Sequence, residues 1–192
     1  MLDFSPLHSG KLYNAMDEEI MAEQRRCIAR VNAYNATTPE EGEKRQELMK
    51  QIFAKVGKNC YIEPPFHCNF GGKFISLGDN VYINFEFIAV DDTFIEIGNN
   101  VLIGPRVTIA VATHPEDPTI RATGAQYNRK VVIEDDVWIG AGAIILPGVT
   151  IHKNSIIGAG SVVTHDIEAN VVAVGNPCRV LRPLKFEDKG KL

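Results

Sequence analysis

An apolar residue recurs at every sixth position through the C-terminal half of the chain. The unbroken series is Ile133, Ile139, Ile145, Ile151, Ile157 and Val163. An α-helix needs apolar residues every three or four positions and a half-buried strand every two, so a period of six fits neither. A fixed repeat is typical of a solenoid, whose units bury their apolar sides by stacking on one another. We therefore expect a triangular β-coil that turns a corner every six residues and points one large residue inward on each side.

The same spacing appears in two earlier stretches. Their members are Ile97, Ile103 and Ile109 and, before them, Leu77, Ile83 and Ala89. The registers of the two stretches differ by two residues, which predicts a small insertion between residues 91 and 95, because a solenoid accepts extra residues where a corner bulges outward. An ordinary β-sandwich whose strands happen to have this spacing is the alternative fold.

The six-residue pattern stops between Thr113 and Val131, and the segment His-Pro-Glu-Asp-Pro-Thr opens the gap. A loop of this length without an apolar period is uncommon in a compact domain and is usually functional or disordered. We therefore expect an excursion loop at about residues 114–130, with His114 as its first residue.

Residues from about 17 to 56 follow a helical spacing, which predicts two helices. The second should start at Thr38-Pro-Glu-Glu, with threonine as the N-cap and proline at the first helical position, and should end at Gly57. We expect this cap, residues 1–57, to cover the exposed edge of the first coil, with a share in substrate binding as the alternative role. The solenoid would then take residues 58–184, and the short charged tail 185–192 is expected to be mobile.

Composition narrows the class of protein. A net charge of −4 and a pI near 5.7 argue against a nucleic-acid partner. The start of the chain resembles no signal peptide and no apolar run reaches bilayer length, so we expect a cytoplasmic protein without a membrane partner. The four cysteines form no CxxC pair and are expected to pack as small apolar side chains rather than to bridge or to bind zinc.

Several motifs resemble one family over roughly residues 10 to 183. Ile139-Gly-Ala-Gly-Ala and Ile157-Gly-Ala-Gly-Ser are similar to the repeats of left-handed β-helix acyltransferases. The flanking motifs resemble those of the maltose and galactoside O-acetyltransferases: Gly10-Lys-Leu-Tyr, Ile62-Glu-Pro-Pro-Phe, Ala112-Thr-His-Pro-Glu-Asp-Pro, Asp136-Val-Trp-Ile-Gly and Gly175-Asn-Pro-Cys-Arg. The resemblance implies a mainly β, left-handed parallel β-helix, a homotrimer with active sites between subunits, and acetyl transfer from acetyl-CoA to a hydroxyl of a maltose, glucose or galactoside type of sugar, without a metal.

The chemistry requires a base, because an alcohol must lose its proton as it attacks the thioester carbonyl. Histidine is the side chain suited to this at neutral pH. His114 matches the catalytic histidine of the family, so the resemblance implies that His114 is the general base. The tetrahedral oxyanion needs a preorganised donor, for which a backbone N–H near residues 141–142 is plausible.

The resemblance also implies which residues bind the acceptor. Asn84 and Asp92 match family positions that contact it, and Asn69 stands where the family carries serine or aspartate. Asp17 matches the maltose-type members. Turn formation is the alternative role for Asn84 and Asp92, and capping of the first helix is the alternative for Asp17.

Residues of the final coils are expected on the acetyl-CoA side. Trp138 precedes a repeat position, so it should lie outside the coil, along the pantetheine arm or at a trimer contact. Ala141, Ala159 and Thr164 match positions where pantetheine follows the coil edge, although small residues also suit tight corners. The positions matching family contacts to the CoA phosphates are Arg179, Arg182 and His165. Histidine replaces a frequent lysine at the last of these, which weakens that phosphate contact.

Two other classes of function stay open. The first is an acetyltransferase for another hydroxyl acceptor, such as serine, an antibiotic or a lipo-oligosaccharide. The second is a metal-dependent lyase on this fold, which needs three convergent histidines. The chain has five histidines, but no pair shows ligand spacing. A non-catalytic scaffold would leave His114 and its loop without a purpose.

Overall fold

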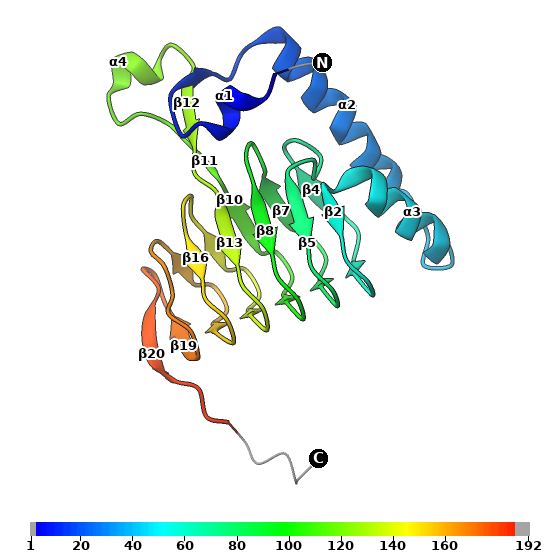
Figure 1. Ribbon diagram of the computed structural model, residues 1–192, viewed down its shortest axis with the longest axis vertical. Helices are drawn as coiled ribbons and strands as arrows, with labels where there is room; N and C mark the ends of the chain where they lie inside the picture. Colours follow the sequence, from blue (N-terminus) through cyan, green and yellow to red (C-terminus); the bar gives the residue numbers. More distant parts are fainter. Residues whose placement is uncertain (1–2, 187–192) are drawn as a thin grey trace.

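The computed structural model describes residues 3–186, and most of them form one parallel β-helix with three faces (Figure 1). The first sheet contains β2 (Lys55–Val56), β5 (Ile75–Leu77), β8 (Ile95–Ile97), β13 (Val131–Ile133) and β16 (Thr150–Ile151). The second sheet contains β3 (Tyr61–Ile62), β6 (Tyr82–Ile83), β9 (Leu102–Ile103), β14 (Trp138–Ile139), β17 (Ile156–Ile157), β19 (Val171–Val174) and β20 (Arg179–Pro183). The third sheet contains β4 (Phe66–Cys68), β7 (Phe87–Val90), β10 (Thr108–Ala110), β15 (Ile144–Ile145) and β18 (Val162–Val163).

Strand pairing confirms the predicted six-residue period. Ile133 pairs with Ile151 in the first sheet and Ile139 pairs with Ile157 in the second, so three six-residue sides make one coil. Every member of the apolar series beginning at Ile133 is 0% exposed. The pairing of Leu77 with Ile97 skips two additional residues, which confirms the predicted insertion before β8.

In the coils from β2 to β19, every turn that departs from the six-residue spacing lies at one corner, where the chain passes from the third sheet to the first. We call this edge the loop corner; it comprises residues 69–74, 91–94, 111–130, 146–149 and 164–166. The longest turn is ordered: it contains β11 (Ala112–Thr113), α4 (Pro118–Arg121) and β12 (Ala125–Asn128). β12 pairs antiparallel with β11 on one side and with β1 (Tyr13–Asn14) on the other. The predicted excursion loop is therefore a hairpin that the N-terminal segment extends into a three-stranded sheet (Figure 1).

The N-terminal segment carries α1 (Ser5–His8), α2 (Glu18–Asn35) and α3 (Gly42–Ile52), and the last two pack at the end of the solenoid that begins with β2 (Figure 1). The predicted bounds of the second helix are wrong at both ends. Thr38 does not cap α3, because residues 38–41 close a turn in which Glu41 N donates to Thr38 O at 3.1 Å and Thr38 N donates to Glu41 Oε2 at 2.8 Å. The helix stops before Gly57, since Phe53 is extended and Ala54 N already bonds to Ile75 O.

The first coil accordingly begins at β2, a little before the predicted boundary at residue 58. The tail predicted to be mobile lies largely outside the described residues, which end at residue 186. All four cysteines are buried free thiols, as the sequence predicts. None of the helices in the described part of the chain is long and apolar enough to cross a membrane.

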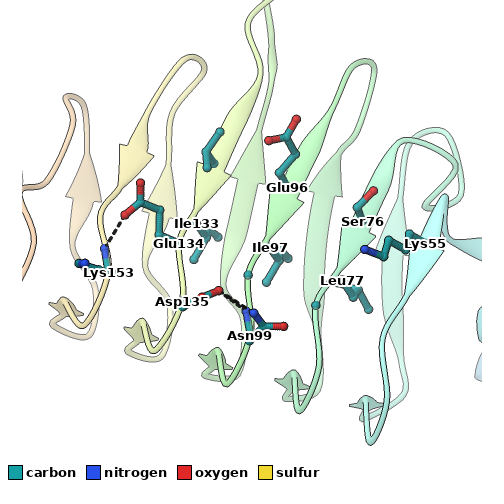
Figure 2. Close-up of a pocket in the computed structure, with 13 residues that line it drawn as sticks. Lys55, Ser76, Leu77, Glu96, Ile97, Asn99, Ile133, Glu134, Asp135 and Lys153 are labelled. Carbon is teal, nitrogen blue, oxygen red and sulfur yellow. Dashed lines mark hydrogen bonds between the residues drawn. The ribbon is translucent and has the colours of Figure 1, made fainter.

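The outer surfaces of two sheets are apolar. Leu102 and Trp138 are about half exposed on the second sheet, and Ile88 and Ile144 are exposed on the third. The first sheet instead presents the charged side chains of Lys55 and Glu96, and Lys153 lies in the turn just after β16 (Figure 2). Exposed apolar rows on two adjoining faces are typical of surfaces that another chain covers.

Candidate active site

His114 follows β11 directly and faces β12 across the excursion hairpin. Its Nδ1 lies 3.0 Å from the backbone oxygen of Ala125. A carbonyl oxygen only accepts hydrogen bonds, so Nδ1 must carry the proton and Nε2 of the neutral ring keeps its lone pair. Since the side chain is exposed, the fold holds an oriented imidazole whose basic nitrogen is free to take a proton.

Asp92 lies on the neighbouring turn of the loop corner, close enough for His114 to affect its titration. Its side chain is nearly buried, with 5% exposed. Oδ1 accepts from Gln126 Nε2 at 3.0 Å and Oδ2 accepts from Asn69 Nδ2 at 2.8 Å. Burial raises the pKa of the Asp92 carboxyl, while these two bonds and the charge of His114 oppose the rise.

Three polar residues missed by the sequence analysis hold this corner together. Gln126 Nε2 lies 2.6 Å from the Tyr13 hydroxyl, and Asn128 Nδ2 donates to Leu7 O at 2.9 Å. Burial raises the pKa of Tyr13 to about 12, so its hydroxyl stays neutral at physiological pH. The amides at positions 126 and 128 alternate along β12 and are both buried, and this alternation of amides was the available signal in the sequence.

The cap helices reach the same corner. Gln24, on α2, donates from Nε2 to Asn69 Oδ1 at 2.7 Å, so Asn69 joins the cap to Asp92. Asp17 is the N-cap of α2, and its Oδ1 accepts from the backbone nitrogens of Glu19 and Ile20 at 3.0 and 3.2 Å. The structure thus shows the capping role of Asp17; its contact with an acceptor stays a prediction.

Asn84 lies elsewhere, in a groove of about 480 Å³ on the outer face of the second sheet. Trp138, Ala141 and Ala159 line the same groove, together with Tyr82 and Leu102. Trp138 is 51% exposed, as its predicted place outside the coil requires. The apolar walls of this groove suit a flexible, largely apolar chain such as pantetheine.

The remaining predicted cofactor residues lie at two other places. Thr164 and His165 sit at the loop corner of the last coil, where Thr164 Oγ1 is 2.8 Å from His165 Nδ1. Arg179 and Arg182 are exposed on β20, at the C-terminal end of the second sheet. Among the described residues, none of these four lines the groove that contains Trp138. One chain therefore carries two separate groups of predicted residues, one at the loop corner with His114 and Asp92 and one along the groove that contains Trp138.

Two sequence profiles match the chain. The maltose acetyltransferase hexapeptide capping motif matches residues 7–57, and the six repeats of the bacterial transferase hexapeptide match residues 130–165. A galactoside O-acetyltransferase of Lactococcus lactis is 49% identical over 96% of this chain and 89% of its own length. The chain belongs to the galactoside and maltose O-acetyltransferase family. The galactoside O-acetyltransferase of Escherichia coli K12 is 44% identical over 95% of this chain and 90% of its own.

Solved structures of this O-acetyltransferase family have the same fold. A maltose O-acetyltransferase from Clostridium difficile 630 superposes with a TM-score of 0.93 at 44% identity, covering 97% of this chain and 99% of its own. A galactoside acetyltransferase in complex with coenzyme A gives 0.91 at 42% identity, covering 98% and 97%. These neighbours confirm the predicted fold class and the resemblance.

A second hollow of this O-acetyltransferase lies on the outer face of the first sheet and measures about 420 Å³ (Figure 2). Its charged groups bond within the fold: Glu134 Oε2 accepts from Lys153 N at 2.9 Å, and Glu96 lies 3.6 Å from Lys130 Nζ. No residue of the predicted site lines it, among those that the structure describes. The described residues also contain no group of three or more His, Cys, Asp or Glu that could hold a metal ion.

The burial of Asp91 is expected to make the stability of this O-acetyltransferase depend on pH. Burial raises the pKa of its carboxyl from 3.8 to about 7, against the opposing effect of hydrogen bonds from Phe70 N and Gly72 N. The folded state then binds more protons than the unfolded state between about pH 4 and pH 7, so this contribution to stability falls as the pH rises through that window. Its full size is on the order of 4 kcal/mol.

We therefore expect wild-type protein to lose more stability between pH 5 and pH 8 than the Asp91→Asn variant does. Urea denaturation at the two pH values measures this. Asp92, whose pKa is also raised, and His8, whose pKa is lowered by burial, are present in both proteins. The difference in pH dependence between wild type and variant therefore reports the contribution of Asp91 alone. Equal pH slopes in both proteins would contradict the assignment.

Proposed function

We propose that this protein transfers the acetyl group of acetyl-CoA to a hydroxyl of a sugar in a ternary complex, with His114 as the general base. The observation that carries the proposal is the bond from His114 Nδ1 to Ala125 O, which leaves Nε2 as the proton acceptor. The named sugar acetyltransferases among its relatives support a sugar acceptor, and the coenzyme A complex of a structural neighbour supports the donor.

The reaction proceeds by direct attack. Nε2 of His114 takes the proton of the sugar hydroxyl as its oxygen bonds to the thioester carbonyl carbon. The tetrahedral intermediate then breaks its carbon–sulfur bond, and the imidazolium returns the proton to the leaving thiolate of CoA. For the oxyanion we propose the Ala141 N–H, because Gly142 N already donates to Pro105 O at 2.8 Å.

We propose that the acceptor lies against Asp92, Asn69 and Asp17 beside His114, and that acetyl-CoA lies along the groove of Trp138, Ala141 and Ala159. Asn84, at one end of that groove, contacts the acceptor from the donor side. Nearer the end of the solenoid, the groups proposed to hold the rest of the CoA molecule and its phosphates are Thr164, His165, Arg179 and Arg182.

The separation of the proposed acceptor residues from the proposed acetyl-CoA groove favours a homotrimer. The reacting atoms must come within about 3 to 3.5 Å of each other, yet His114 and the groove lie on different edges of one chain. The apolar outer faces of the second and third sheets can meet between subunits, which would bring the loop corner of one subunit to the groove of the next. Each active site then uses His114 from one chain and Asn84 from its neighbour.

An acceptor panel tests the activity. We expect CoA release from acetyl-CoA to depend on glucose, maltose or a galactoside, and to saturate with the sugar. N-acetylglucosamine, serine and chloramphenicol serve as competing acceptors in the same assay. Release driven by serine or chloramphenicol but by no sugar would retain the acetyltransferase and reject the sugar assignment.

Mixing variants tests the shared site. We expect the protein to elute at about three times its 21.2 kDa chain mass, and the His114→Ala and Asn84→Ala proteins to be weakly active on their own. After co-refolding, mixed trimers contain interfaces with both wild-type residues, so activity should rise above that of either variant. If a verified mixed trimer shows no gain in activity, His114 and Asn84 do not form one site across a subunit interface, and the shared site is contradicted.

A further inference from the structure

We infer that Asp91 is a positioning residue for the sugar acceptor: it fixes the turn at residues 69–72 and thereby presents the Asn69 carboxamide to Asp92. The inference rests on the proposed function, because Asn69 and Asp92 are placed on the acceptor side there. Asp91 itself is 0% exposed and cannot contact a substrate.

The two carboxyl oxygens of Asp91 match two backbone N–H groups of the turn. Its Oδ1 accepts from Phe70 N at 2.6 Å and its Oδ2 accepts from Gly72 N at 2.8 Å. Above about pH 7, where its carboxyl is ionised, Asp91 offers two acceptor oxygens and no donor, so it can satisfy the two backbone N–H groups at once. An amide of the same size offers one acceptor and turns its NH2 donor toward the other N–H.

The opposite side of the turn is closed by the cap. Gly71 and Gly72 have positive φ values of 60° and 83°. A Cβ on Gly71 would lie 2.5 Å from the backbone of Cys27 in α2, and one on Gly72 would lie 2.7 Å from the Ile52 side chain. The turn is therefore wedged between the cap helices and Asp91, which leaves it little freedom while both sides are intact.

This arrangement fixes the position of the Asn69 side chain. It accepts from Gln24 Nε2 at 2.7 Å and donates to Asp92 Oδ2 at 2.8 Å. Two consecutive aspartates thus act on one turn, Asp91 on its backbone and Asp92 on the Asn69 side chain. A shift of the turn would release the Asn69 to Asp92 bond and leave the Asp92 carboxylate beside His114 without one of its two fixed partners.

A double-mutant cycle on acceptor KM tests the inference. We expect Asp91→Asn and Asn69→Ala each to raise the KM for the sugar by about tenfold, with little change in the KM for acetyl-CoA, whose groove lies on another sheet. Because Asp91 acts through Asn69, the double variant should resemble Asn69→Ala rather than multiply the two effects. Multiplied effects, or an equal rise in the KM for acetyl-CoA, would overturn the inference.

Asp79→Asn is the matched control. Asp79 also accepts from a backbone nitrogen, that of Lys58 at 2.7 Å, but it lies at a different corner. Its replacement should leave the sugar KM unchanged. If Asp91→Asn does not fold, Asp91→Ser replaces it, since serine keeps an oxygen acceptor in a smaller side chain.

Hydrogen exchange read by mass spectrometry makes the test independent of turnover. The peptide covering residues 69–74 should exchange faster in the Asp91 variant than in wild-type protein, whereas the peptide covering β14 should not change. Unchanged exchange at residues 69–74 would overturn the inference even for a fully active enzyme. If instead no sugar is acetylated by wild-type protein, the proposed function fails while the exchange result still decides whether Asp91 holds the turn.

Discussion

Replacing His114 with alanine is expected to lower acceptor-dependent acetyl transfer by about 10²-fold or more, because in the proposed mechanism the attacking hydroxyl loses the group that removes its proton. The Ala125 carbonyl orients the ring from the far side of the hairpin, so the replacement deletes the proposed base and leaves the strands paired. Rates at saturating sugar and acetyl-CoA measure the loss, and the KM for acetyl-CoA should change little.

His152→Ala provides the matched control. His152 also orients its ring through Nδ1, which lies 3.0 Å from Glu134 Oε1, but it belongs to the first sheet and not to the loop corner. Its replacement should leave the turnover rate within about twofold of wild type, as expected for a surface substitution. A His114→Ala protein that is folded and equally active would reject the general-base assignment.

Replacing Gly71 with alanine is expected to destabilise the fold by about 3 kcal/mol or more. The positive φ of 60° strains any residue with a Cβ, and here that Cβ would also lie 2.5 Å from backbone atoms of Cys27. The collision is with a helix backbone, which cannot move away as the end of a flexible side chain can. Urea denaturation of the variant measures the loss of unfolding free energy.

The Gly160→Ala variant separates the strain of a positive φ from the collision of the Cβ with the cap. Gly160 has a φ of 67°, close to that of Gly71, but a Cβ there would find no atom of residues 3–186 within 4 Å, its two chain neighbours aside. The Gly160→Ala variant should lose only the part of the unfolding free energy that comes from backbone strain, about 1 kcal/mol. Equal losses in the two variants would show that the cap does not press on the 69–72 turn.

The solenoid was predictable because its signal is repeated. Each coil places the same kind of residue at the same place, so the buried positions from Ile133 to Val163 identify the period and the inward face. The change of register between the two earlier stretches identifies the insertion before β8. The resemblance added His114, whose place on the excursion hairpin agrees with the structure. The bounds of α3 were wrong because Thr38 and Glu41 bond to each other in a turn that has the composition of a helix start.

The polar network under the acceptor side could not be predicted in the same way. Tyr13, Gln126 and Asp92 lie far apart in the sequence, and apart from the alternating amides of β12 nothing in their separate segments indicates that they meet. Their bonds exist only because β1 pairs with β12 and the excursion folds back over the loop corner. Asp91 was likewise hidden, since nothing local distinguishes a carboxylate that holds a backbone turn from one that faces solvent.

Because the coil turns of variable length are confined to the loop corner, the loops and the strands of this fold can change independently in evolution. Lengthening or rebuilding a turn at the loop corner alters the surroundings of His114 without shifting the strands that form the Trp138 groove, because those strands pair through the regular second sheet. With the acceptor at the loop corner and acetyl-CoA in the groove, as we propose, new acceptors can be acquired by changes in loop sequence while the donor stays the same. The same property makes the hairpin at residues 111–130 a replaceable part for engineering acceptor choice.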